Sequence, residues 1–250
     1  MLGRTPPTIS LGLDYTFTVS NFLLLGKVML EGKKMIVTGG GGVLGSSVAA
    51  VARKQGAEVF LVDVIDQPQE VTGSYFQVDL LDAKAVSAFF DDMGDFDCLA
   101  NIAGGFDMGP TVWESSDELW DSMFSINVTT LRRVLSAAIP RMIGVGSGSV
   151  VNVGAMGALK AGGNMGAYAA AKSTVMRLTE SLSDEVKHKG INVNAVLPTL
   201  IDTPRNRADM PGSDFSEWVD PVDLANVVCF LSSSQSRAIH GALVPVTGLL

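Results

Sequence analysis

Two side chains in the C-terminal half of the chain have the types and the spacing needed for proton transfer. Tyr168 and Lys172 enclose three alanines in the segment YAAAK, and a helix places residues four apart on the same face. A free phenol has a pKa of about 10 and relays protons poorly at neutral pH. A nearby ammonium favours the phenolate and so lowers the pKa of the phenol. The pair therefore predicts a tyrosine of lowered pKa that donates or accepts a proton at a reacting oxygen.

A glycine-rich segment separates a predicted buried strand from a predicted helix. Residues 38–45 read TGGGGVLG. Glycines in this place let the backbone approach a pyrophosphate, whose charge is then stabilised by the helix N-terminus. The segment predicts a dinucleotide site that involves Gly39, Gly42, Val43 and Leu44, and the alternative is a plain flexible turn.

An acidic residue follows the second predicted strand at the distance expected for a ribose contact. Asp63 comes 24 residues after Gly39, and dinucleotide sites place such an acid about 20 residues after the glycines. A carboxylate there would repel a 2′-phosphate, and no lysine or arginine lies within residues 39–44 or directly after Asp63. The sequence favours NAD(H) over NADP(H). An ordinary acid that caps the strand end is the alternative for Asp63.

The elements that must position these residues alternate between short apolar runs and longer helical patterns. The strand candidates are residues 35–38, 58–63, 75–79, 96–103, 149–153, 191–196 and 242–246. The helix candidates are residues 43–55, 82–93, 117–142, 165–189 and 221–232. Most strand candidates are continuously apolar, which is typical of parallel strands covered on both faces. The alternation predicts an α/β fold with a Rossmann-type, doubly wound parallel sheet of seven strands.

The length, composition and net charge of the chain indicate a single domain and exclude several kinds of partner. A chain of 250 residues, with 47% hydrophobic and 18% charged residues, can hold one large α/β domain. We place this domain at residues 31–250, after an N-terminal extension over residues 1–30. The net charge of −8 argues against nucleic acid as a partner. The sequence contains no run of 18 apolar residues, so we expect no membrane-spanning segment.

Cysteine and histidine usage gives no sign of a metal site or of secretion. Cys98 and Cys229 lie far apart within apolar runs, which favours buried thiols in a reducing compartment over a disulfide. The two histidines and two cysteines of the chain are too scattered to form a metal site. The extension has an apolar stretch broken by Lys27 and no clear cleavage site, unlike a signal peptide. We expect a cytoplasmic protein.

Taken together, these residues resemble the short-chain dehydrogenase/reductase family over roughly residues 33–248. The matching positions are the glycine segment, Asp63, Asp79, Asn101-Ile102-Ala103-Gly104, Asn127, Tyr168, Lys172 and Thr203. The resemblance implies that Asp79 and its neighbour Leu80 border the adenine and that Asn101 helps to hold the central strands. It places Ala103 and Gly104 in the cofactor site. It also implies that Asn127 relays protons through water to Lys172, which binds the nicotinamide ribose.

The segment after the sixth predicted strand would complete the cofactor site. Pro198, Ile201 and Thr203 lie there, and the resemblance implies that Thr203 meets the nicotinamide carboxamide. A simple helix cap before Pro204 is the alternative for Thr203. A capping or kink residue is the alternative for Asn127.

Three departures from the family pattern affect the predicted site. Val43 replaces the usual middle glycine of the loop, and Thr199 replaces the glycine that normally follows the proline. Ala155 stands 13 residues before Tyr168, where the family has a serine that hydrogen-bonds the substrate oxygen. Loss of one such donor commonly costs about 3 kcal/mol, or roughly 100- to 1,000-fold in rate. The site must use another donor, such as Asn164 or a backbone amide, or take a substrate that needs none.

The same replacement of serine by alanine occurs in dihydropteridine reductase, a subgroup that keeps the tyrosine and the lysine. This chain is similar to that subgroup in patches, at residues 103–105, 163–168 and 195–218. The similarity does not transfer the pteridine substrate, because Asn127 and the longer helical regions look more like ordinary family members.

Residues 204–219 are predicted to form a lid that closes over a small-molecule substrate. Met210, Phe215 and Trp218 in this segment could face a flat or apolar substrate, together with Phe106 after the fourth strand. The alternative is that these side chains fix the loop to the body of the protein.

The main prediction is an NAD(H)-dependent oxidoreductase that acts on a small carbonyl, alcohol or quinonoid substrate. The alternative is a nucleotide-binding sensor or structural protein with little or no turnover, which Ala155 favours and the intact Tyr168 and Lys172 oppose. A lyase or isomerase that keeps NAD bound is a third hypothesis, without a sequence feature of its own. The resemblance implies a homotetramer, or a homodimer, formed through the helices at 117–142 and 165–189 and the C-terminal strand.

Overall fold

The computed structural model describes residues 28–250, so most of the expected extension over residues 1–30 lies outside the described residues. The strands are β1 (Lys34–Thr38), β2 (Glu58–Asp63), β3 (Ser74–Gln77), β4 (Cys98–Asn101), β5 (Gly148–Val153), β6 (Ile191–Pro198) and β7 (Leu243–Val246). The helices are α1 (Val43–Lys54), α2 (Ala83–Met93), α3 (Asp117–Phe124), α4 (Thr130–Val145), α5 (Gly166–Val186), α6 (Pro204–Asp209) and α7 (Pro221–Leu231).

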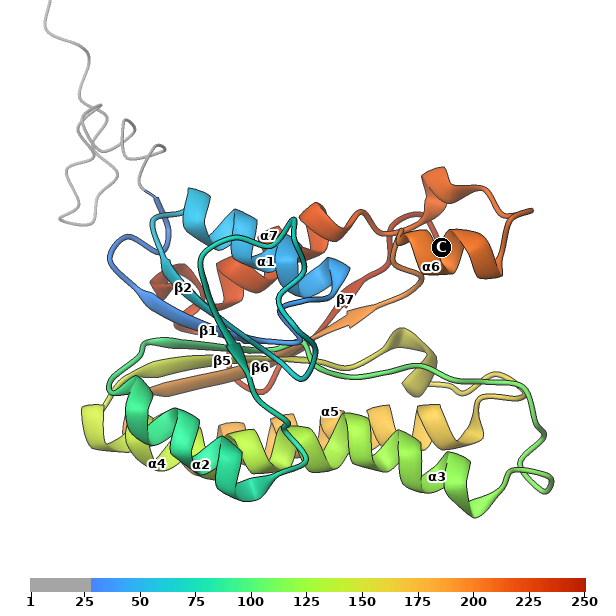
Figure 1. The fold of residues 1–250 in the computed structure, drawn as a ribbon, viewed down its shortest axis with the longest axis horizontal. Helices are drawn as coiled ribbons and strands as arrows, with labels where there is room; N and C mark the ends of the chain where they lie inside the picture. Colours follow the sequence, from blue (N-terminus) through green and yellow to red (C-terminus); the bar gives the residue numbers. More distant parts are fainter. Residues whose placement is uncertain (1–27) are drawn as a thin grey trace, which may run out of the picture.

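The seven strands form one parallel sheet in the order β3-β2-β1-β4-β5-β6-β7. This arrangement confirms the predicted doubly wound, single-domain fold. α1 and α7 cover one face of the sheet, and α2, α4 and α5 cover the other (Figure 1). The strand order reverses between β1 and β4, and in such sheets a ligand binds beyond the carboxyl ends of the strands at this reversal. Figure 1 shows α6 and the long connection from β4 to α3 at that end of the sheet.

Both faces of the sheet are buried, which explains why most strands are continuously apolar. In β1, Met35 and Val37 pack into the core on the side of α1 and α7, whereas Ile36 packs on the side of α2 and α4. A strand points successive side chains to opposite faces, so a strand covered on both sides needs apolar residues at every position. β3 differs because it lies at the edge of the sheet, and three of its four residues are exposed.

The two cysteines are buried free thiols, as predicted. Cys98 on β4 and Cys229 on α7 belong to the same apolar core. Burial raises the pKa of Cys98 to about 11 and that of Cys229 to about 12. Because the thiolate is the reactive form of cysteine, both thiols are inert near neutral pH.

The predicted continuous helix over residues 117–142 is wrong in its middle. A π-helical turn at Ser125–Thr129 separates α3 from α4. Within it, Asn127 donates from Nδ2 to the carbonyl of Met123, four residues earlier, at 3.0 Å. A side-chain amide that takes this carbonyl competes with the backbone donor, and the chain widens locally to the i→i+5 pattern, which is frequent at functional sites.

Gly45 is required where α1 meets the glycine segment. A Cβ atom at this position would lie 2.1 Å from the Gly39 carbonyl oxygen, which belongs to the backbone and cannot move aside alone. We expect Gly45→Ala to lower the free energy of unfolding by about 1–3 kcal/mol, because the first turn of α1 must shift. Denaturant unfolding monitored by circular dichroism measures this change.

Gly42→Ala is the matched control for this prediction. Its Cβ atom would lie 3.4 Å from the same carbonyl oxygen, and Gly42 has a φ of −82° that alanine adopts freely. Equal losses of stability in the two variants would contradict the packing explanation.

Candidate functional site

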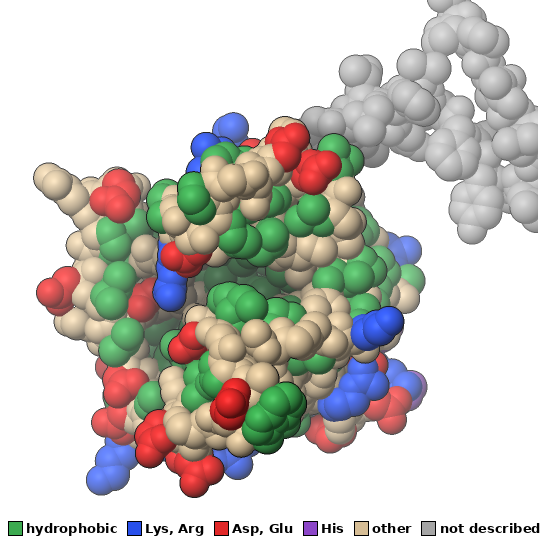
Figure 2. Space-filling view, turned by 90° about the vertical axis from the view of Figure 1, so that its right-hand side faces the viewer, with side chains coloured by type: hydrophobic (Ala, Val, Ile, Leu, Met, Phe, Trp, Pro, Cys, Tyr) green, Lys and Arg blue, Asp and Glu red, His purple; other side chains and the backbone are tan. Residues whose placement is uncertain are grey.

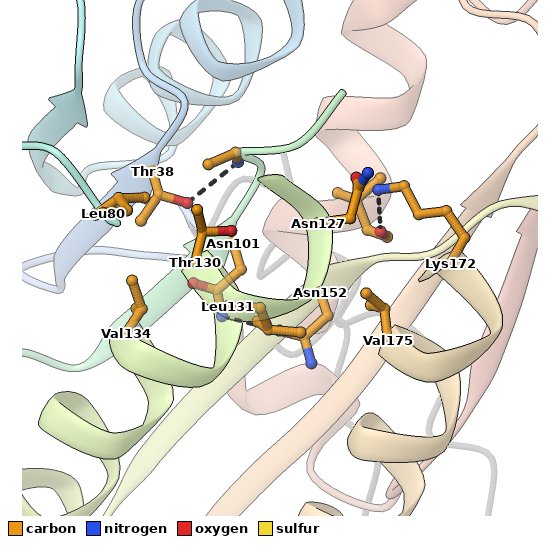
Figure 3. A pocket seen from close by; sticks show the side chains of 12 residues that line it. Thr38, Leu80, Asn101, Asn127, Thr130, Leu131, Val134, Asn152, Lys172 and Val175 are labelled. Carbon is orange, nitrogen blue, oxygen red and sulfur yellow. Dashed lines mark hydrogen bonds between the residues drawn. The ribbon is translucent and has the colours of Figure 1, made fainter. Parts of the chain in front are cut away.

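The predicted catalytic residues gather beyond the carboxyl ends of the central strands. Figure 2 views the molecule from this end and shows a hollow at its centre with hydrophobic side chains along its edges. A small internal cavity of about 10 Å³ lies within the site, and polar side chains form much of its wall. These polar side chains are Thr38, Asn101, Asn127, Thr130, Asn152 and Lys172 (Figure 3).

Lys172 is a buried cation at the end of β5. Its side chain lies on α5, only 6% of the residue is exposed, and Nζ donates a hydrogen bond of 2.9 Å to the carbonyl of Val153. Burial lowers the pKa of Lys172 from 10.5 to about 8, because surroundings of low dielectric constant disfavour the ammonium. Lys172 is therefore able to exchange its proton close to neutral pH.

Tyr168 lies one helical turn before Lys172 and packs against an aromatic neighbour. The rings of Tyr168 and Phe106 meet edge to face, with their centroids 4.8 Å apart. The predicted lowering of the tyrosine pKa is wrong, since burial raises the pKa of Tyr168 to about 12. Desolvation of the phenolate causes this shift, and the hydrogen bond of Lys172 goes to Val153 and not to the phenol. Tyr168 is held as a neutral phenol, which is the form that donates a proton.

Asn127 binds the backbone of the segment that follows β4. Its Oδ1 accepts from the Gly105 N–H at 3.1 Å, and its Nδ2 donates to the Gly105 carbonyl at 3.0 Å. A Cβ on Gly104 would lie 2.7 Å from Asn127 Oδ1 and 3.2 Å from Lys172 Nζ, so both polar groups lie beside this glycine. Figure 3 shows the two side chains next to each other. The structure thus brings Asn127 and Lys172 together at Gly104, and the water relay stays a prediction.

A chain of buried amides crosses the sheet below this point. Asn101 on β4 donates to Asn152 on β5 at 2.8 Å, and Asn152 donates to the Thr179 hydroxyl at 2.9 Å. This chain fits the expectation that Asn101 helps to hold the central strands. Asn152 was not predicted as a site residue, although a polar residue within an apolar strand, in register with Asn101, was a usable signal.

The glycine segment forms a close contact between β1 and the end of β4. Gly39 has a φ of +69°, and a Cβ there would lie 2.8 Å from the Ala103 nitrogen. The N–H of Ala103 donates to Thr38 Oγ1 at 3.2 Å. Glycine at position 39 lets the two segments meet, and the glycines contribute no side chains of their own, so the segment forms a cradle that suits the close approach of a pyrophosphate.

α1 begins directly at this cradle. Gly42 is its N-cap residue, and the first turn contains no acidic side chain. Val43, at the position of the expected glycine, is 39% exposed, so its side chain points away from the core, and Leu44 is buried. The N-terminal N–H groups and the dipole of α1 can thus receive an anionic group, and the residues present fit a dinucleotide.

Asp63 lies at the end of β2, against the same cradle. Its Oδ2 accepts from the Gly41 N–H at 2.9 Å, and its Oδ1 accepts from the Val64 N–H at 2.7 Å. The position suits a ribose contact, and these bonds also make Asp63 a cap of the strand end. Asp79 is exposed and accepts from the Leu81 N–H at 2.8 Å, while the neighbouring Leu80 is buried against the small cavity.

The remaining cofactor-binding candidates lie between the end of β6 and the start of α6. Pro198 is the last residue of β6, and Ile201 forms a parallel bridge with Val219. Thr203 is the N-cap of α6 and accepts from the Asn206 N–H at 3.1 Å. The cap that was the alternative for Thr203 is therefore present, and a cofactor contact through Thr203 stays a prediction.

The predicted lid consists of α6 and a short 3₁₀ turn at Phe215–Glu217. Arg207 binds the Asp202 carboxylate through two contacts of 2.5 and 2.6 Å, and its guanidinium lies 4.7 Å from the centroid of the Phe215 ring. The rings of Phe215 and Trp218 are 4.8 Å apart. Trp218 is only 6% exposed, which favours the alternative that its side chain holds the lid in place, and its contact with substrate stays a prediction. Met210 and Phe215 are half-buried.

Ala155 offers no hydrogen-bond donor and is 5% exposed. Ser149 does not replace the missing hydroxyl, since its Oγ donates to the Ser232 carbonyl at 2.9 Å in the core. Asn164 is exposed and has a φ of +62°, and its carbonyl accepts from the Gly109 N–H at 3.0 Å. Asn164 thereby joins the two loops that flank Tyr168.

Residues 28–250 show neither a metal centre nor a membrane span. No three His, Cys, Asp or Glu side chains of this range cluster in a way that could hold a metal ion. No helix within it has the length and apolar character needed to cross a membrane.

Comparisons with known proteins agree with this geometry. The sequence model described as short chain dehydrogenase matches residues 33–213. The short chain dehydrogenase adrF of Penicillium rubens is 31% identical over 246 residues, which cover 87% of this chain and 96% of the relative. The chain belongs to the short-chain dehydrogenase family of NAD(P)-dependent oxidoreductases.

Two solved structures of the same fold carry nicotinamide cofactors. Carveol dehydrogenase from Mycobacterium avium, solved in complex with NAD, has a TM-score of 0.79 and 26% identity, and the match covers 88% of this chain and 98% of that one. A structure from Beutenbergia cavernae, described as an NAD(P) dependent gluconate 5-dehydrogenase and holding NADP at low occupancy, has a TM-score of 0.81 and 26% identity. That match covers 89% of this chain and 98% of that one.

The buried lysine should make stability depend on pH. Lys172 has a pKa of about 8 in the folded chain and near 10.5 when unfolded, so the unfolded chain binds more protons between these values. We expect the free energy of unfolding of the wild type, relative to Lys172→Met, to rise by up to about 3 kcal/mol as the pH increases from 7.5 to 10.5.

Chemical denaturation at several pH values measures this difference. The Lys160→Met variant, which removes an exposed lysine, controls for the loss of one charge. A difference between wild type and Lys172→Met that stays constant over this pH range would show that the lysine is not desolvated.

Proposed function

We propose that the protein is an NAD(H)-dependent oxidoreductase that transfers a hydride to or from a small carbonyl, alcohol or quinonoid substrate. The observation that carries this proposal is the buried ammonium of Lys172, held at the end of β5 beside Asn127 and one helical turn from Tyr168. The bound nicotinamide supplies or accepts the hydride. The residues that would hold the cofactor are Gly39, Gly42, Val43, Leu44, Asp63, Asp79, Leu80, Asn101, Ala103, Gly104, Pro198, Ile201 and Thr203, together with Tyr168 and Lys172.

The contribution of the chain itself is proton transfer at the substrate oxygen. Tyr168 is a neutral phenol near pH 7, and it donates its proton when a carbonyl is reduced. In the reverse direction its phenolate accepts the proton of the alcohol, so alcohol oxidation requires that Tyr168 first lose its own proton. The Lys172 ammonium stabilises the phenolate that forms. Since the pKa of Lys172 is about 8, its proton exchanges readily, and Asn127 would pass protons on through water.

Ala155 determines which substrates suit this site. Without a hydroxyl at this position, a substrate carbonyl receives one hydrogen bond fewer in the transition state, and one such bond is worth roughly 100-fold or more in rate. Substrates that accept a hydride easily, such as quinonoid compounds, depend less on this bond. The aromatic ring of Phe106 against Tyr168 supports a flat or apolar substrate, with Met210 and Phe215 on the lid and Asn164 or a backbone amide as the remaining donor.

The alanine at position 155 also supports a closer relation to dihydropteridine reductase-like members of the family. Those members combine alanine at the position of Ala155 with an intact tyrosine and lysine. We propose this subgroup as the nearest in chemistry, and we do not extend the proposal to a pteridine substrate.

The preference for NAD(H) rests on Asp63. Its carboxylate lies on the glycine cradle through the Gly41 N–H, where it would meet the adenosine ribose and repel a 2′-phosphate. No arginine or lysine lies within residues 39–44 to attract that phosphate.

The wider organisation of the protein is also a proposal. We assign residues 31–250 to the dinucleotide-binding domain and residues 1–30 to an extension, and we expect a cytoplasmic homotetramer or homodimer. Exposed apolar side chains on α4, at Ile143 and Val145, support an assembly through the α4 and α5 side of the sheet.

Replacement of the tyrosine tests the proposed proton transfer. We expect Tyr168→Phe to lower kcat for NADH oxidation by at least about 100-fold, because the acid is lost. The Kd for NADH should stay within about 3-fold, since the ring and its packing remain. Stopped-flow turnover with a panel of quinones, ketones and aldehydes, combined with fluorescence titration of NADH, measures both quantities. Equal turnover in wild type and variant would contradict proton transfer by Tyr168. Binding of NADH without turnover in the wild type would favour the alternative of a nucleotide-binding sensor.

Restoring a hydroxyl at position 155 tests the role of the alanine. We expect Ala155→Ser to raise kcat for simple ketones by at least about 10-fold, because a donor returns to the substrate oxygen, and to change the rate with quinonoid compounds less. Ala161→Ser, which adds the same hydroxyl to an exposed position of the following loop, is the control. A ketone rate that does not respond to Ala155→Ser would mean that the substrate oxygen binds elsewhere.

A further inference from the structure

One side of the glycine cradle is covered by residues that the proposed function does not use. A Cβ on Gly41 would lie 2.9 Å from Ile65 Cδ1 and 2.9 Å from Tyr75 Oη, so both side chains lie directly on this glycine. The Gly41 N–H also donates to Asp63 Oδ2 at 2.9 Å. A carboxylate, a branched alkyl group and a phenol hydroxyl therefore enclose a single glycine of the cradle.

Two side chains of β3 hold the segment after β2 in this place. Tyr75 Oη donates to the Ile65 carbonyl at 3.0 Å, and Gln77 Nε2 donates to the Val64 carbonyl at 3.1 Å. Tyr75 and Gln77 are two residues apart in a strand and so point to the same side of the sheet. They anchor two successive carbonyls, although Val64 and Ile65 are themselves 55% and 50% exposed. The position of Ile65 is thus fixed by the sheet edge and not by burial in a core.

Burial and the nearby carboxylates keep Tyr75 in its donor form. Burial raises the pKa of Tyr75, and the carboxylates of Asp63 and Asp66 raise it further. The hydroxyl therefore stays protonated and continues to donate to the Ile65 carbonyl over the physiological pH range.

We propose that Ile65, anchored by Tyr75 and Gln77, is a second determinant of cofactor choice, because it fills the space beside Asp63 that the 2′-phosphate of NADP(H) would need. This inference rests on the proposed dinucleotide site and adds exclusion by volume to the repulsion by Asp63. Neutralising Asp63 alone leaves the space filled, and trimming Ile65 alone leaves the repulsion. The two effects should therefore be separable in single and double variants.

Binding of both dinucleotides tests this inference. The ratio of the Kd for NADPH to the Kd for NADH is measured by fluorescence titration in wild type, Asp63→Asn, and Asp63→Asn combined with Ile65→Ala or Tyr75→Phe. We expect Asp63→Asn to lower the ratio about 10-fold, because one close charge repulsion is lost. Adding Ile65→Ala should lower it by a further 5-fold or so, and adding Tyr75→Phe by about 2- to 5-fold, as expected for loss of one hydrogen bond.

Two control variants belong to the same loop. Asp66→Asn removes one carboxylate charge, and Val64→Ala shortens another branched side chain of the loop. Neither side chain is among the atoms nearest to a Cβ on Gly41, so both variants should leave the ratio unchanged. Tyr75→Phe keeps the ring and its packing, so the test stands even if Ile65→Ala fails to fold.

A ratio that neither Ile65→Ala nor Tyr75→Phe changes in the Asp63→Asn background would overturn the inference, while the proposed oxidoreductase would stand. A wild-type protein that binds neither dinucleotide would overturn both.

Discussion

The site depends on a positive charge held where water is largely excluded. Moving the pKa of Lys172 from 10.5 to about 8 corresponds to a cost of roughly 3 kcal/mol in the folded protein. The carbonyl of Val153 offsets part of the desolvation with one hydrogen bond. A charge in such a place polarises nearby groups far more strongly than an exposed charge does, and the proposed stabilisation of a Tyr168 phenolate relies on this effect.

Several features of the fold position and accommodate the charged group of Lys172. Gly104 leaves room for Lys172 Nζ and Asn127 Oδ1 because it has no side chain, and the π-helical turn at Ser125–Thr129 contains Asn127. On the other side of the sheet reversal, the cradle at Gly39 approaches Ala103 at the end of β4. The doubly wound topology brings these segments together, since the carboxyl ends of β1, β4 and β5 are adjacent.

The fold could be predicted closely from the sequence, because apolar runs and glycine positions are local signals. Each observed strand begins and ends within two residues of its prediction, and Asp63 closes β2 as expected. A kink at Asn127 was predicted only as the alternative role of that residue. Its π-helical form was not predicted, because no local pattern reveals the hydrogen bond from the Asn127 side chain to Met123. The direction of the Tyr168 pKa shift was predicted wrongly. It is set by burial, and Phe106, which packs against the ring, comes from a loop distant in sequence. The burial of Trp218 and the cover of Ile65 over Gly41 likewise arise from contacts between segments that no local pattern reveals.

The pKa of Lys172 is the quantity that tests this account most directly. Nuclear magnetic resonance of protein labelled at the lysine side chains, titrated from pH 6 to 11, follows each lysine separately, and the Lys172→Met variant identifies its signal. We predict one lysine that titrates near pH 8 and is missing from the spectrum of the variant. A Lys172 signal that titrates near the ordinary lysine value of about 10.4 would contradict the buried charge on which the proposed chemistry depends.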